Sequence, residues 1–185
     1  MALTATVRRF EIALADSDRG VYEALDLRVA QHPSESERYL IARVVARALE
    51  HADGVDFSRG LAADDEPALW QRDLRGDLQA WIEIGLPAAD RLHRASKTGA
   101  RLAVYGWRQL EALAVELSER AVHRAERIEL FALAPEFLDE VAAGLDRNNK
   151  WDLSVAGGTV YLATARGQHE TAVTRIVVQP ATGAR

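Results

Sequence analysis

The chain has 185 residues, of which 48% are hydrophobic and 28% charged, and its formal net charge is −5. This size and composition are typical of one globular domain, so a single domain spanning residues 1–185 is predicted. The negative charge argues against a protein that coats nucleic acid over its whole surface, although it permits a local basic groove. The absence of cysteine excludes disulfides, thiolate nucleophiles and cysteine-ligated metals.

Several other classes of protein lack support in the sequence. No apolar run approaches the roughly 18 residues of a membrane-spanning helix, and no signal-peptide pattern is present, so we expect a cytoplasmic protein without a membrane partner. No glycine-rich phosphate loop occurs, which argues against a nucleotide cofactor. No serine stands in a nucleophile-elbow pattern. The five histidines never fall at ligand spacing on one helix face, which argues against a zinc site.

The first part of the chain predicts a β-hairpin followed by a helix. Segments 6–14 and 21–29 alternate apolar and polar residues, and the turn-rich segment 16–20 joins them. Ser34 and Glu37 then stand at the spacing of a capping box, which predicts a helix start at Ser34. The apolar positions of that helix form one stripe that would pack on a sheet: Leu40, Ile41, Val44, Val45 and Ala48.

The middle of the chain predicts short strands and a basic helix. Segment 57–61 reads as a short strand or a connector. Segments 68–73 and 78–84 form two strands that the tight turn 75–77 joins. A short basic helix then spans residues 88–98.

The last part of the chain alternates strands and helices. Strands at 101–106 and 126–133 flank a helix at 107–121, which implies a parallel pair with a right-handed crossover. A helix opens at Pro135. The final strands are predicted at 151–155, 159–163 and 171–178. These elements predict an α/β fold with a mixed β-sheet and flanking helices.

An acidic cluster precedes the strand at 68–73. Asp64, Asp65 and Glu66 are adjacent and are followed by Pro67, so they belong to a loop that enters the strand. Three neighbouring anions repel one another and need either full solvation or a cation. A solvated turn and a metal-binding loop therefore both remain open for this cluster.

Two further carboxylates stand in informative places. Glu83 lies in an otherwise apolar strand, where a charge is costly unless it is paired, hydrogen-bonded or metal-bound. Glu83 is therefore either the partner of an arginine on an edge strand or a functional acid. Glu35 would sit in the first turn of its helix, where the helix dipole favours an anion, and it could also reach a metal. Glu37 is explained by the capping box.

Several stretches of the chain together resemble the YaeQ family of bacterial proteins. They are Met1-Ala2-Leu3, His32-Pro33-Ser34-Glu35, Arg59-Gly60-Leu61, Ala63-Asp64-Asp65-Glu66-Pro67, Trp81-Ile82-Glu83-Ile84-Gly85-Leu86-Pro87, Arg91 and Ala95-Ser96-Lys97. The resemblance covers essentially the whole chain, and segment 59–87 is its most specific part. The family looks like a divergent branch of the PD-(D/E)XK fold of restriction endonuclease-like proteins. The resemblance implies a nuclease-like core, with an early helix on a mixed sheet and a strand hairpin that presents the acids, plus an N-terminal hairpin and C-terminal strands.

The resemblance also implies roles for particular residues. In the general motif an aspartate is followed by a Glu-x-Lys strand, and Asp65 and Glu83 match its two acidic positions. The chain departs from the motif at the lysine, because Gly85 occupies that position. Lys97 or Arg94 on the following helix could fill the displaced position. Lys97 is preferred, because arginine does not accept a proton.

The predicted site follows from these assignments. Mg²⁺ or Mn²⁺ would be held by Asp65 and Glu83, with Glu35 or Asp64 reaching it directly or through water. Lys97 would act beside the metal as the third catalytic residue. Two arginines are expected to bind backbone phosphates, Arg91 and Arg94.

Two functions are compatible with this site. The first is a divalent-metal-dependent nuclease-like hydrolase that acts on phosphodiesters and therefore has nucleic acid as its partner. The second is a non-catalytic regulatory protein that binds nucleic acid or protein on a decayed nuclease fold, because the missing lysine at Gly85 removes part of the catalytic motif.

Overall fold

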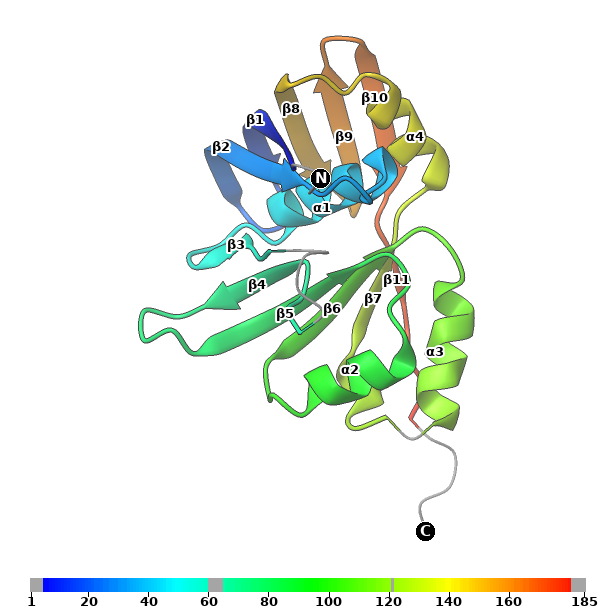
Figure 1. Ribbon diagram of the computed structural model, residues 1–185. Helices are drawn as coiled ribbons and strands as arrows, with labels where there is room; N and C mark the ends of the chain where they lie inside the picture. Colours follow the sequence, from blue (N-terminus) through cyan, green and yellow to red (C-terminus); the bar gives the residue numbers. More distant parts are fainter. Residues whose placement is uncertain (1–4, 60–64, 121, 181–185) are drawn as a thin grey trace. The chain divides into compact units, whose positions relative to one another are not determined.

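The computed structural model describes residues 5–59, 65–120 and 122–180 (Figure 1). The chain folds as two compact units. Unit 1 comprises Met1–Leu49 and Leu133–Val173, and unit 2 comprises Glu50–Ala132 and Thr174–Arg185. The single domain predicted for 1–185 stays a prediction, because compactness does not measure whether the two units unfold together.

Unit 1 is a five-stranded mixed sheet with two helices. Its elements are β1 (Thr6–Asp16), β2 (Val21–Gln31), α1 (Glu37–Leu49), α4 (Pro135–Ala143), β8 (Asn148–Ala156), β9 (Thr159–Thr164) and β10 (Gly167–Ala172). The strand order is β10-β9-β8-β1-β2, and β1 pairs with β8 in parallel while the other neighbours are antiparallel. The predicted N-terminal hairpin is confirmed, with β1 and β2 in antiparallel register.

The alternation of the strands explains which face of this sheet is buried. In β1, Phe10 and Ile12 are buried, and Phe10 meets Trp151 of β8 edge to face, with 4.9 Å between ring centroids. Successive strand residues point to opposite faces, so Ala13 lies on the exposed side. The helices α1 and α4 lie on the same side of the sheet (Figure 1).

The predicted start of the first helix is wrong. Helix α1 begins at Glu37, and Ser36 caps it, because the Ser36 hydroxyl accepts a hydrogen bond from the Tyr39 N–H at 3.2 Å. Ser34 instead contacts the His32 imidazole at 2.6 Å between Oγ and Nδ1. The capping box assigned to Ser34 and Glu37 therefore does not form, and Glu35 lies before the helix rather than in its first turn.

Unit 2 is a six-stranded mixed sheet with two helices and a short 3₁₀ helix. Its elements are β3 (Val55–Phe57), β4 (Leu69–Arg72), β5 (Leu78–Ile84), α2 (Ala89–Ser96), β6 (Arg101–Gly106), α3 (Leu110–Glu119), η2 (Ala125–Arg127), β7 (Glu129–Ala132) and β11 (Thr174–Ile176). The strand order is β11-β7-β6-β5-β4-β3, with β5, β6 and β7 parallel. The predicted strand–helix–strand crossover is confirmed.

The two helices of unit 2 pack on one face of its sheet. Leu92 of α2 and Leu113 of α3 share a buried core with Leu102 and Val104 of β6, and Trp81 of β5 packs against it. Because Trp81 and Glu83 are two residues apart in β5, both side chains lie on this helix-covered face.

The structure has the mixed α/β class that the sequence predicts, but the strands form two sheets rather than one. The strand predicted at 171–178 is divided into β10 and β11, which belong to different sheets. Of the helices that the structure describes, none is long and apolar enough to span a membrane.

Candidate functional site

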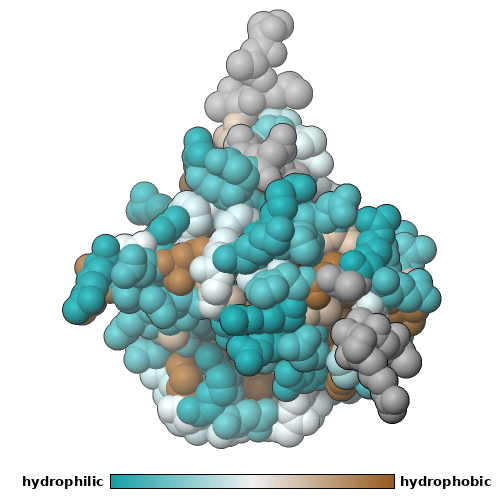
Figure 2. Space-filling model, turned by 90° about the horizontal axis from the view of Figure 1, so that it is seen from below, coloured by the Kyte–Doolittle hydropathy of each residue, from teal (hydrophilic) through white to brown (hydrophobic). Residues whose placement is uncertain are grey.

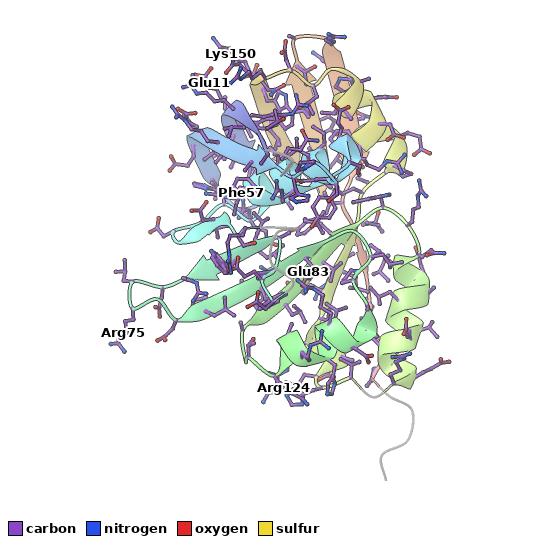
Figure 3. The ribbon with its side chains drawn as sticks, in the orientation of Figure 1. Glu11, Phe57, Arg75, Glu83, Arg124 and Lys150 are labelled. Atoms are coloured by element: carbon purple, nitrogen blue, oxygen red, sulfur yellow. The ribbon has the colours of Figure 1, made fainter. Side chains whose placement is uncertain are left out.

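Glu83 is the buried acid of unit 2 and is only 5% exposed. Its Oε1 atom accepts two hydrogen bonds of 2.6 Å, one from the Trp81 indole Nε1 and one from the Arg91 Nε. Arg91 reaches Glu83 because β5 ends at Ile84, the chain turns at Gly85 with a φ of 87°, and α2 returns over the same face. Figure 3 labels Glu83 among the strands of unit 2.

The Arg91 guanidinium connects Glu83 to the acidic loop. Besides its bond to Glu83, Arg91 donates from Nη2 to the Glu66 carbonyl oxygen at 2.5 Å. Its guanidinium carbon also lies 5.8 Å from the centroid of a Trp81 ring, within range of a cation–π contact. One cation therefore joins the carboxylate of β5, the tryptophan beside it and the backbone of the loop that precedes β4.

The acidic loop has a second arginine. Glu66 accepts hydrogen bonds from Arg59 Nη2 at 2.6 Å and from Arg59 Nε at 2.9 Å. These bonds to Arg59 lower the pKa of the Glu66 carboxyl below its ordinary value. Asp65 is exposed in the same loop, and Asp64 lies outside the described residues.

Glu35 belongs to unit 1 and has a different environment. Its side chain is 1% exposed and forms an ion pair with Arg43, with 3.0 Å between Oε1 and Nη2. Its Oε2 atom accepts a hydrogen bond from the His32 N–H at 3.1 Å. Burial is the main cause that raises the pKa of Glu35, while Arg43 and His32 act in the opposite direction. Through these two contacts, Glu35 connects the loop before α1 to Arg43 of that helix.

Lys97 and Arg94 are both exposed near the end of α2. Lys97 is the C-cap residue of this helix and stands six residues after Arg91, which corresponds to about 9 Å along the helix axis. Within the described part of the chain, Lys97 forms no ion pair with a carboxylate. Arg91, rather than Lys97, supplies the positive charge at Glu83.

The described residues do not form a metal-binding donor set. Within residues 5–59, 65–120 and 122–180, no three His, Asp or Glu side chains lie together so that they could hold a metal ion. At Glu83, the Oε1 atom already accepts from Arg91 and Trp81. A magnesium ion prefers oxygen ligands in near-octahedral geometry, and a guanidinium bonded to its carboxylate competes with that coordination.

The hairpin of β4 and β5 carries an aromatic and cationic pair that the sequence analysis did not assign. Trp70 stands opposite Trp81 in the antiparallel register, so the two side chains share a face. The Arg72 guanidinium carbon lies 4.4 Å from the centroid of a Trp70 ring. The signal in the sequence is the spacing Trp70-x-Arg72, which places both residues on one side of a strand.

The comparisons with known proteins decide the family. The family model described as YaeQ protein matches residues 1–173. The chain belongs to the YaeQ family.

YaeQ relatives cover nearly the whole chain. The YaeQ protein of Escherichia coli (strain K12) is 30% identical over 184 residues, which span 94% of this chain and 97% of that protein. The crystal structure of the YaeQ protein from Pseudomonas syringae has a TM-score of 0.86 and 33% identity, over 95% of this chain and 97% of that one. The YaeQ protein from Xanthomonas axonopodis pv. citri has a TM-score of 0.84 and 34% identity, over 96% and 99% of the two chains.

Proposed function

We propose that this YaeQ protein is a non-catalytic nucleic-acid-binding protein on a nuclease-like fold, in which the Arg91 guanidinium takes the place that a metal ion would need. The observation that carries the proposal is the bond of 2.6 Å between Arg91 Nε and Glu83 Oε1, together with the bond from Arg91 to the Glu66 carbonyl. The Arg91 guanidinium neutralises the Glu83 carboxylate as a metal ion would, but it does not activate a water molecule for attack on a phosphodiester.

The arrangement of unit 2 supports the nuclease-like part of the proposal. The hairpin of β4 and β5 belongs to a mixed sheet, and Glu83 projects from the second strand of the hairpin. Asp65 lies in the loop before the first strand, as the PD-(D/E)XK resemblance implies for the other acid. The proposal includes a cytoplasmic location, where nucleic acid would be available.

Trp70 of the hairpin supports the nucleic-acid part. Single strands bind proteins through aromatic side chains that stack on bases and through arginines that contact phosphates. Trp70 and Arg72 supply these two groups on β4, and Trp70 is half-buried. Half-burial fixes the Trp70 ring while it leaves part of the ring accessible.

A metal-dependent nuclease is the second candidate, because Arg91 joins Glu83 to the loop that also carries Asp65. In that function Arg91 would have to leave Glu83 before the two carboxylates could hold Mg²⁺ or Mn²⁺. The ion would polarise the phosphate and activate water when bound. Lys97 stands about 9 Å further along α2 than Arg91, which argues against a role beside that ion.

Nucleic-acid binding and cleavage distinguish these candidates. We expect labelled single-stranded DNA and RNA to bind equally well with EDTA and with Mn²⁺, and to remain intact over the incubation. The double substitution Trp70→Ala, Arg72→Gln should weaken binding by roughly ten-fold, because a base–aromatic stack contributes ~1–3 kcal/mol. Fluorescence anisotropy measures the binding, and gel electrophoresis measures the cleavage.

Matched variants complete the experiment. Tyr161→Ala, Arg166→Gln removes an exposed aromatic residue and a charge from unit 1 and should leave binding unchanged. Cleavage that requires Mn²⁺ and is lost in the Asp65→Ala, Glu83→Ala protein would overturn the non-catalytic proposal in favour of the nuclease. Absence of binding to every nucleic acid would overturn both.

A further inference from the structure

Unit 2 contains a cavity of about 240 Å³ at the end of α2, away from the Glu83 carboxylate. Its walls come from the last turn of α2, the start of β6 and the 3₁₀ helix η2. The lining residues that matter for its chemistry are Ser96, Gly99, Arg101, Arg124, Arg127 and Glu129. Figure 3 labels Arg124 beside the end of α2.

The charges that line the cavity do not cancel. Arg101 binds Glu129 at 2.6 Å and also binds Glu50 at 2.6 Å, so the single lining glutamate is already engaged. Arg124 and Arg127 are exposed and form no ion pair within the part of the chain that the structure describes. Two positively charged side chains at this cavity are therefore available to an anion.

The backbone holds these two arginines together. Arg124 has a φ of 52° and a ψ of 40°, a left-handed conformation that is uncommon for a residue with a side chain. Its carbonyl oxygen accepts a hydrogen bond from the Arg127 N–H at 2.9 Å. Arg124 precedes the first residue of η2 and Arg127 is its last residue, and both residues line the cavity.

Two more positively charged residues lie near the cavity, at the end of α2. Arg94 and Lys97 are exposed in and just after the last turn of α2, the turn that also contributes Ser96 to the cavity wall. Figure 2 shows mostly hydrophilic side chains on the face that is viewed from below. Two further cations therefore lie at the end of the helix that contributes Ser96 to the cavity wall.

The size and the donors of the cavity select the ligand. Its volume is below the roughly 300–1,000 Å³ typical of sites for larger organic ligands. Arginine presents planar pairs of N–H donors that match phosphate oxygens in a bidentate arrangement. We propose that this cavity binds a phosphate group, carried either by a nucleic-acid strand or by a small phosphate compound.

The nucleic-acid source of the phosphate rests on the proposed function. Arg91 in the first turn of α2 and Ser96 in its last turn are five residues apart, or about 7.5 Å along the helix axis. A strand that lies along α2 would reach both ends of this helix, since successive nucleotides of one strand rise by about 3.4 Å. The cavity would then fix one backbone phosphate while the hairpin of β4 and β5 contacts bases.

The test compares the double variant Arg124→Gln, Arg127→Gln with Arg28→Gln, Arg147→Gln, which removes the same charge from exposed positions of unit 1. The probes are inorganic phosphate, a nucleoside 5′-monophosphate and a single-stranded oligonucleotide without a terminal phosphate, all measured in EDTA. We expect the cavity variant to bind the oligonucleotide on the order of ten-fold more weakly than wild type. The slope of log K against log salt should decrease in magnitude by about 0.7, since the cavity binds one phosphate and each phosphate contact on a single strand contributes about 0.7.

Each outcome has a defined meaning. Weaker oligonucleotide binding in the cavity variant alone supports a backbone phosphate. Binding of only the small phosphates, lost in the cavity variant, supports a free phosphate compound while the proposed nucleic-acid function fails. Equal binding of all probes by the two variants overturns the cavity proposal and leaves the proposed function standing. If no probe binds the wild-type protein, the cavity proposal is overturned.

Discussion

Replacing Arg91 by alanine should lower the free energy of unfolding by about 3 kcal/mol, because it leaves a buried carboxylate without its cation. The side chain of Glu83 is 6% exposed and that of Arg91 is 24% exposed, so water replaces the lost guanidinium only in part. Trp81 would still donate one hydrogen bond to Glu83. The same substitution also removes the bond to the Glu66 carbonyl, so the loop before β4 should become less protected. Urea denaturation measures the stability, and hydrogen exchange measures the protection.

A double-substitution cycle separates the ion pair from the loss of packing. Glu83→Gln in the Arg91→Ala background should cost much less than the two single changes together, since the uncompensated charge is then absent. Arg91→Lys keeps the charge but loses the second donor group, so its cost should be intermediate. An Arg91→Ala protein with the stability of wild type would contradict the assigned role of Arg91.

Replacing Arg43 by methionine should destabilise the protein by about 3–5 kcal/mol, the range expected when a buried ion pair loses one partner. The side chains of Arg43 and Glu35 are 3% and 1% exposed, so neither charge can turn to solvent. Arg43 also donates to the Ala30 carbonyl at 2.9 Å, which ties α1 to β2. Chemical denaturation of the variant measures this loss. The matched control is Arg38→Met, because Arg38 lies on the same helix but pairs with the half-exposed Asp139.

The pH dependence of stability provides a second readout of the same pair. Burial raises the pKa of Glu35 above its ordinary value of 4.5, so the folded protein binds this proton more tightly than the unfolded chain does. Stability contributed by Glu35 is therefore present below pH 4.5 and is lost as the pH rises through the raised pKa of the folded state. The unfolding free energy of wild type minus that of Glu35→Gln should decrease over this window. A difference that stays constant or increases with pH would contradict the assignment.

Local patterns account for most individual elements of this fold. Alternation of apolar and polar residues identifies β1, β2 and their hairpin, and the strand–helix–strand order identifies the parallel pair of β6 and β7. It does not determine which strands join, because the pairing of β1 with β8 brings together segments that lie far apart in the sequence. The division of the last strands between two sheets has the same cause.

The start of α1 illustrates how a tertiary contact overrides a local motif. The spacing of Ser34 and Glu37 fits a capping box, but Ser36 caps the helix. Glu35 does not lie in the first helical turn, because it forms an ion pair with the buried Arg43, eight residues later in the sequence. This ion pair holds the loop before α1 in a conformation in which Ser34 does not cap the helix. A local motif contains no information about which neighbouring carboxylate will be buried.

The candidate site was predictable in part. The apolar neighbours of Glu83 in the strand indicate a charge that needs a partner, and an arginine was one of the alternatives left open. The role of Arg91 depends on how α2 packs over β5. The position of Arg91 in the sequence and its charge do not reveal this packing. Three assignments stay predictions: metal binding by Asp64, Asp65 and Glu35, catalysis by Lys97, and phosphate binding by Arg94.

A thermal melt with Mn²⁺ tests most directly whether Arg91 takes the place of a metal at Glu83. A ligand that binds only the folded state must raise the melting midpoint. The wild-type protein and Glu83→Gln are melted in EDTA and in excess Mn²⁺. We expect Mn²⁺ to shift the melting midpoint of wild type by no more than it shifts the midpoint of Glu83→Gln. A rise in the wild-type midpoint that Glu83→Gln lacks would show that Glu83 holds the ion and would contradict the account.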